Sequence, residues 1–155
     1  MTKHHIRTFD PKTRGTTATS GRFSQAIRVG NLIALRGQTG QTLDGRFIGA
    51  GNPGAQARQA CRNIKALVEE AGGRMEDVIK LTTYVTDVRH RPAVYQEITR
   101  AFRRAAPCST GLVVTALATP EMQVEIDALA VVTERQSHGP GRATPGRPSR
   151  ARRKR

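Results

Sequence analysis

The segment Ala106–Val114, APCSTGLVV, places a thiol and two hydroxyls at the start of an apolar run. The proline, the glycine and the apolar residues predict a loop that enters a buried strand. A nucleophilic Cys108 would need a neighbouring base to lower its pKa. The histidines of the chain are His4, His5, His90 and His138. The sequence pattern places none of them beside Cys108. Cys108 is therefore expected to be a small residue in the wall of a pocket rather than a covalent catalyst. Hydroxyls such as those of Ser109 and Thr110 at a strand start are typical of caps or ligand contacts.

Two carboxylates, Glu125 and Asp127, interrupt an apolar strand expected over residues 123–132. Because side chains alternate along a strand, both carboxylates lie on one face. The opposite face carries Val124, Ile126, Ala128, Ala130 and Val132. That apolar face suits burial under helices, so the carboxylate face needs another cover. Further copies of the chain are a common cover for such a sheet.

Turn signals and periodicity indicate the elements that position these residues. Gly30-Asn31 separates two β-prone runs and predicts a hairpin. Asn52-Pro53 begins a helix that Gly72-Gly73 ends, and Arg91-Pro92 begins a second helix. The strands are expected over residues 23–29, 32–35, 78–86, 109–116 and 123–132. The order hairpin, helix, strand, helix, strand, strand predicts one α+β domain with both helices on one sheet face.

The net charge of +14 is concentrated at the C-terminus. Residues 135–155 hold seven arginines and a lysine but no acid. Such a segment cannot bury enough apolar surface to fold, so we expect a disordered basic tail after a domain of residues 20–134. Residues 1–19 form an N-terminal segment. The tail's charge predicts nonspecific polyanion binding, although it has no aromatic side chains to stack on bases.

Several classes of function are excluded by what the sequence lacks. No apolar run approaches the ~20 residues of a membrane helix, and the N-terminus has no apolar core of a secretory signal. Cys61 and Cys108 do not make a disulfide framework, and Cys61 fits the buried face of the first helix. A reduced cytoplasmic protein is therefore expected. No metal-ligand spacing or phosphate-binding glycine motif occurs, so we predict neither a metal nor a cofactor.

Five segments, in order over about residues 20–132, carry a family likeness. They are FSQAIRVGN, RGQTG, QARQACRNIKALVEEAGG, VIKLTTYVTD and STGLVVTALATPEMQVEIDALAVV. They resemble the Rid family of reactive intermediate deaminases, also called YjgF-type proteins and formerly L-PSP endoribonucleases. The resemblance implies a chorismate-mutase-like fold and a homotrimer whose sheets form a barrel with ligand pockets between subunits. It also implies cofactor-free hydrolysis of small enamines and imines to a keto acid and ammonia.

The resemblance assigns pocket roles, and the sequence departs from some of them. Glu125 matches the acidic residue that positions the attacking water, and Gly37 matches a glycine whose backbone contacts the ligand. Cys108 stands where the deaminases carry a carboxylate-binding arginine, directly before the matched pair Ser109 and Thr110. Phe23 replaces a tyrosine and so keeps the ring without the hydroxyl.

Two further positions differ from the family pattern, and one offers a replacement for the missing arginine. Tyr95 stands where the family often has an asparagine. Arg36 precedes the ligand glycine in place of a small polar residue, as in a branch of the family that lacks the usual arginine. Arg36 either supplies the missing positive charge to the pocket, or it pairs with Glu125 or Asp127, or it is solvated outside.

Three functions remain open after these observations. The first is a hydrolase of a small, carboxylate-bearing imine, enamine or related metabolite. The second is a non-catalytic trimer that binds a small ligand or has a regulatory role. The third and weakest is an RNA-associated protein, which the basic tail suggests.

Overall fold

The computed structural model describes residues 2–10 and 21–133, and the predicted basic tail lies outside this part. The strands are β1 Lys3–Phe9, β2 Phe23–Val29, β3 Leu32–Gln38, β4 Val78–Val85, β5 Cys108–Val113 and β6 Val124–Val131. The helices are α1 Pro53–Glu70 and α2 Arg91–Phe102, with short 3-10 turns η2 Met75–Asp77 and η3 Val88–His90. The strands form one sheet in the order β1-β2-β3-β6-β4-β5, in which only the β4–β5 pair is parallel.

The predicted start and end signals act as expected in α1. The Asn52 side chain accepts a hydrogen bond of 2.9 Å from the Ala55 N–H, and Pro53 occupies the first turn. After the helix, Gly72 has a φ of +81°, which a side chain would strain, and the Gly73 N–H donates to the Val68 carbonyl at 2.8 Å. These are the contacts of a glycine-terminated helix.

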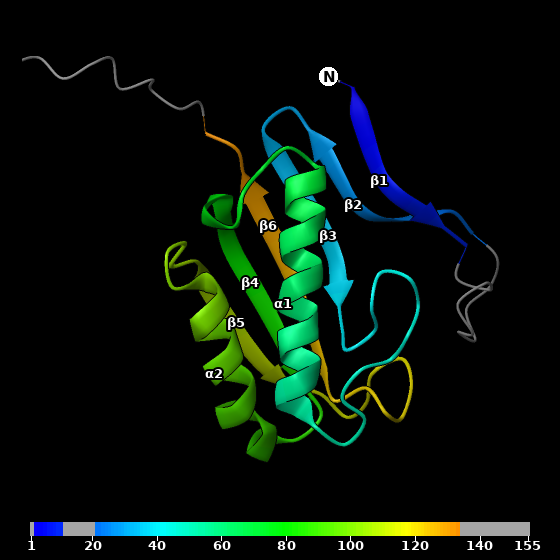
Figure 1. Ribbon diagram of the computed structural model, residues 1–155, viewed down its shortest axis with the longest axis vertical. Coiled ribbons are helices and arrows are strands. Elements are labelled where there is room, and N and C mark those ends of the chain that lie inside the picture. Colours follow the sequence, from blue (N-terminus) through cyan, green and yellow to red (C-terminus); the bar gives the residue numbers. More distant parts are fainter. Residues whose placement is uncertain (1, 11–20, 134–155) are drawn as a thin grey trace, which may run out of the picture.

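Both helices lie on one face of the sheet, as Figure 1 shows, and the core lies between these two layers. Ile64 and Leu67 of α1 and Leu81 of β4 are fully buried. In β6 the predicted alternation is confirmed. Its helix-side residues are at most 2% exposed: Val124, Ile126, Ala128 and Ala130. The fold is therefore the predicted α+β domain, and among the described residues no helix is long and apolar enough to cross a membrane.

Strand β1 is an element that the sequence patterns do not predict, since they indicate only an N-terminal segment over residues 1–19. It pairs antiparallel with β2, from Lys3 opposite Val29 to Phe9 opposite Phe23. Its residues are mostly exposed, so the sequence carries no strong burial pattern there. An edge strand of this kind is held by backbone pairing, and here also by an ion pair between Arg7 and Glu70 of α1.

Strand β3 is longer than predicted, which matters for the candidate site. The expected strand ended at Leu35, whereas β3 continues to Gln38. Its pairing with β6 shifts register between Leu35 and Gln38, which marks a bulge. The bulge contains Arg36 and Gly37, two of the predicted site residues.

Candidate functional site

The sheet face that α1 and α2 do not cover, called the open face below, carries most of the polar candidates. Glu125 and Asp127 of β6 lie on it, as the strand alternation predicted. A hollow of about 300 Å³ lies on this face. Its lining includes Arg36, Gly37, Lys80, Thr82, Asp127 and Leu129. The strand order brings these residues together because β6 lies between β3 and β4.

Gly37 and Glu125 are in close contact. A Cβ atom built on Gly37 would lie 1.8 Å from Oε1 and 2.6 Å from Cδ of Glu125. Only glycine at position 37 leaves room for the Glu125 carboxylate against the β3 backbone. The structure therefore brings together two of the predicted site residues, and it gives the requirement for glycine a steric reason.

The electrostatic surroundings of Glu125 favour its protonated form. Its pKa is raised above the ordinary glutamate value, first by burial and second by the charge of Asp127, while Arg36 acts in the opposite direction. Asp127 accepts a hydrogen bond from the Tyr84 hydroxyl at 3.0 Å, and this bond raises the pKa of Tyr84. A carboxyl group with a raised pKa can exchange a proton with a ligand closer to neutral pH than an exposed glutamate can.

Arg36 lies at the rim of the hollow and is exposed. Its guanidinium carbon is 5.0 Å from the centre of the Phe9 ring, a cation–π distance. Within residues 2–10 and 21–133 it makes no ion pair with Glu125 or Asp127. The charge of Arg36 thus acts on Glu125 through space, and a direct pair is not formed.

Phe9 and Phe23 form an aromatic wall next to Arg36. Their ring centres are 6.2 Å apart with planes tilted by 35°, and Phe23 is 53% exposed. Phe9 lies on strand β1, which the sequence patterns do not predict, so it is not among the predicted site residues. Its position opposite Phe23 in the β1–β2 pair is what brings the two rings together.

Cys108 and Thr110 lie on the open face but far from Glu125. In register, Glu125 is opposite Tyr84, which is beside Leu112, four residues beyond Cys108. Two strand spacings and four residues of strand rise separate Cys108 from Glu125 by about 16 Å. Within one chain, therefore, these two predicted site residues do not meet.

Lys80 is a cation next to Cys108 that the sequence analysis did not single out. It pairs in register with Cys108, and its ammonium donates a hydrogen bond to the Thr110 hydroxyl. The alternation of Lys80, Thr82 and Tyr84 along β4 was the signal that could have placed it on the open face.

Tyr95 and Ser109 are on the other side of the sheet. They line a separate hollow of about 320 Å³ between α2 and β5. A Cβ atom on Gly111 would lie 2.0 Å from the Tyr95 hydroxyl oxygen, so this ring packs directly against the β5 backbone. The guanidinium of Arg91 lies 5.0 Å from the centre of the same ring. Within the chain, these two predicted residues lie on the helix side of the sheet, away from Glu125 on the open face.

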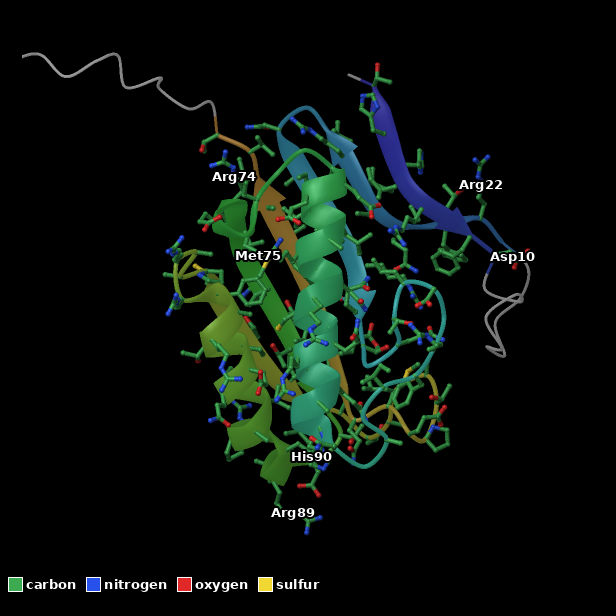
Figure 2. All side chains as sticks on the ribbon, in the orientation of Figure 1. Asp10, Arg22, Arg74, Met75, Arg89 and His90 are labelled. Carbon is green, nitrogen blue, oxygen red and sulfur yellow. The ribbon has the colours of Figure 1, made fainter. Side chains whose placement is uncertain are left out.

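The two cysteines differ sharply in their surroundings. Cys61 is 5% exposed in the core, as predicted, and burial with the nearby Glu97 charge raises its pKa to about 12. Cys108 is exposed. His90 lies where α2 begins (Figure 2), whereas Cys108 follows the other end of that 12-residue helix, which is about 18 Å long. The described residues also contain no group of three metal-binding side chains.

Replacing Cys108 by valine should be nearly neutral. The exposed thiol has no histidine beside it to act as a base, and valine is favoured in strands. The free energy of unfolding should therefore change by no more than ~0.5 kcal/mol. Chemical denaturation measures this change, and turnover of a small imine, the substrate class that the sequence resemblance implies, should also be unchanged. A large loss of turnover with unchanged stability would instead assign chemistry to the thiol.

Comparison with known proteins adds family information to this geometry. A family model described as Endoribonuclease L-PSP matches residues 13–132. A protein of Dermatophagoides farinae named 2-iminobutanoate/2-iminopropanoate deaminase is 31% identical over 112 residues, covering 72% of this chain and 87% of the relative. A protein of Escherichia coli (strain K12) with the same name is 30% identical over 122 residues, covering 77% and 94%.

Solved structures show the same fold. Rv2704 from Mycobacterium tuberculosis, a member of the YjgF/YER057c/UK114 family, superposes with a TM-score of 0.70 at 28% identity, over 84% of this chain and all of that one. RidA from the Antarctic bacterium Psychrobacter sp. PAMC 21119 has a TM-score of 0.66 at 30% identity, over 76% of this chain and 94% of that one.

Proposed function

This chain belongs to the endoribonuclease L-PSP family, which includes the Rid and YjgF proteins, and we propose that it is a cofactor-free hydrolase of a small carboxylate-bearing imine or enamine. Relatives named as 2-iminobutanoate/2-iminopropanoate deaminases support the substrate class. The observation that carries the proposal is the carboxyl group of Glu125, half-buried against Gly37, with a raised pKa and with Arg36 nearby.

The pocket is proposed to form between copies of the chain, in a homotrimer. Cys108 and Glu125 are about 16 Å apart within one chain, so a site that uses both positions needs a second chain to supply one of them. Apolar side chains on the open face support an interface. Leu32, Leu112 and Leu129 are each at least 40% exposed there.

The proposed reaction adds water to a carbon–nitrogen double bond. The carboxylate of Glu125 orients the water and takes one of its protons, while the hydroxyl oxygen bonds to the imine carbon. The proton held by Glu125 and the proton of the new hydroxyl group pass to the nitrogen. The carbon–nitrogen bond then breaks, and ammonia leaves as the carbon–oxygen double bond forms. The imine carbon is already electrophilic, so the protein needs to supply only position and charge, and no cofactor.

The experiment that tests this function measures keto-acid release from 2-iminopropanoate generated in situ. We expect the purified full-length protein to accelerate release over a blank without protein. Absence of acceleration at micromolar protein would overturn the hydrolase proposal for this substrate. It would favour the alternative that the chain only binds a small ligand.

Arg36 is proposed to bind the substrate carboxylate in place of the arginine that Cys108 replaces. Arg36→Ala should weaken binding of pyruvate, a small carboxylate, by ~1.5–3 kcal/mol, the contribution of a charged hydrogen bond. Calorimetric titration measures this affinity. Arg46→Ala is the matched control because Arg46 is an exposed loop arginine paired with Asp44, and its loss should leave pyruvate affinity unchanged. Equal affinities for wild type and Arg36→Ala would remove Arg36 from the pocket.

A further inference from the structure

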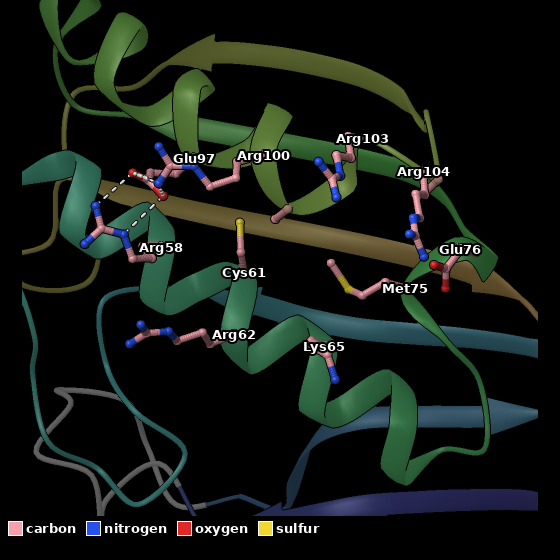
Figure 3. A pocket seen from close by; sticks show the side chains of 12 residues that line it. Arg58, Cys61, Arg62, Lys65, Met75, Glu76, Glu97, Arg100, Arg103 and Arg104 are labelled. Atoms are coloured by element: carbon pink, nitrogen blue, oxygen red, sulfur yellow. Dashed lines mark hydrogen bonds and ion pairs between the residues drawn. The ribbon is translucent and has the colours of Figure 1, made fainter.

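A further hollow lies between α1 and α2, on the opposite side of the sheet from Glu125. It has a volume of about 390 Å³, and Figure 3 shows its lining side chains. The helix α1 contributes a stripe at helical spacing: Arg58, Cys61, Arg62 and Lys65. The facing stripe comes from α2 and the turn that follows it, with the same spacing in sequence: Glu97, Arg100, Ala101 and Arg104. We call this hollow the interhelical groove.

The floor of the interhelical groove is apolar and uncharged. It is made by Cys61, Met75, Ala101 and Ala105. The Cys61 sulfur points into the space between the helices in Figure 3. Because burial raises the pKa of this thiol to about 12, it adds no negative charge at neutral pH. The floor thus suits an apolar group.

The rim of the groove carries an excess of positive charge. Six of its lining residues are basic: Arg58, Arg62, Lys65, Arg100, Arg103 and Arg104. Only two, Glu76 and Glu97, are acidic. The buried carboxylate of Glu97 is already held at 2.8 Å by Arg58 and at 3.1 Å by Arg100. In the part of the chain that the structure describes, Arg103 and Arg104 take part in no ion pair.

We propose that the interhelical groove is a binding site for a small organic anion with an apolar body. The apolar body would lie on the floor between the helices, and the carboxylate, phosphate or sulfonate group would meet Arg103 and Arg104 at the rim. The volume falls in the usual range of small-molecule sites, about 300–1,000 Å³. The positive charge of the rim requires that the ligand be negatively charged.

The same observations argue against a nucleic acid as the occupant. The α1 stripe spans eight residues, about 10 Å of helix rise, which is short for tracking a phosphate backbone. None of the lining residues is aromatic, and base stacking is the main apolar contact of single-stranded nucleic acids. The groove combines a basic rim with an apolar floor, as an amphiphilic ligand requires.

The test uses two fluorescent probes that differ by one charged group. 1-Anilinonaphthalene-8-sulfonate carries the anion, and N-phenyl-1-naphthylamine is the same apolar body without it. We expect saturable binding of the sulfonate to the full-length protein, and at least tenfold weaker binding to the double variant Arg103→Gln/Arg104→Gln. The uncharged probe should bind equally to both proteins.

Three controls separate the groove from the rest of the molecule. Arg46→Gln/Arg89→Gln removes the same charge from two exposed arginines outside the groove and should bind the sulfonate as wild type does, with the basic tail retained in every protein. Ala101→Phe fills the floor and should weaken both probes. Glu125→Gln should bind both probes normally, which makes the result independent of the proposed hydrolase.

The outcome that overturns the proposal is equal sulfonate affinity in wild type and in Arg103→Gln/Arg104→Gln. The arginine variant decides the matter even if Ala101→Phe does not fold, because exposed arginines contribute little to folding. A labelled oligouridylate provides the alternative occupant. If only its binding falls in the arginine variant, the rim is a nucleic-acid surface and the small-anion site is rejected.

Discussion

Glu125→Gln should lower the rate of imine hydrolysis by about 10²–10⁴-fold, the usual contribution of a positioned acid–base group. The glutamine keeps the size of the side chain against Gly37 but cannot accept a proton from water. Keto-acid release from 2-iminopropanoate measures the effect. Glu121→Gln removes an exposed carboxylate just before β6 and is the matched control, with an expected rate equal to wild type.

The pH dependence provides a second readout for Glu125. Because its pKa is raised, the reactive carboxylate forms at a higher pH than for an exposed glutamate, so the wild-type rate should rise as pH increases through the raised pKa. Any residual activity of Glu125→Gln should not show this rise of rate with pH. A wild-type rate that did not change with pH, or a Glu125→Gln rate equal to wild type, would exclude this role.

The stability of the protein should respond to pH in the opposite direction from its activity. A raised folded-state pKa means that folding favours protonated Glu125. The contribution of this protonation to the free energy of unfolding is fully present below the ordinary pKa of 4.5 and is lost as pH rises through the folded-state pKa. The neutral glutamine avoids this loss. At pH 7 the free energy of unfolding of Glu125→Gln should therefore equal or exceed that of wild type, and the difference should shrink toward acidic pH.

Gly37→Ala should reduce turnover nearly as much as Glu125→Gln, by about 10²-fold or more. The added Cβ would lie 1.8 Å from the Glu125 carboxylate oxygen, so the carboxylate must leave its place. Turnover with the same substrate measures the loss. Gly54→Ala is the control, since a Cβ there meets its nearest neighbours at 3.5 Å, and alanine stabilises a helix by up to ~1 kcal/mol relative to glycine.

The double variant Gly37→Ala/Glu125→Gln separates displacement of the carboxylate from general damage to the strand. If glycine acts only by leaving room for Glu125, the double variant should be no slower than Glu125→Gln alone. Additive losses would mean that Gly37 has another role, such as a backbone contact with the ligand. Wild-type turnover in Gly37→Ala would show that the close contact does not matter for the reaction.

Much of the fold could be predicted from local signals. Asn52-Pro53 and Gly72-Gly73 mark the ends of α1, and the alternation along β6 separates Ile126 from Glu125. Such signals are readable because capping, φ preference and side-chain alternation depend on neighbours within a few residues. Strand β1 was not predictable in this way. Its support comes from pairing with β2, not from burial of its own side chains.

The sequence by itself determined the identities of the candidate residues, the sheet face that holds Glu125, and the absence of an arginine at Cys108. Tertiary structure decided which of them meet. The strand order puts β6 beside β3, so Glu125 lies against Gly37, while β4 separates Glu125 from β5. It also put Phe9 next to Arg36 and aligned the two stripes of the interhelical groove. These contacts join residues far apart in the chain, so they depend on sheet order and helix packing, which no local pattern encodes.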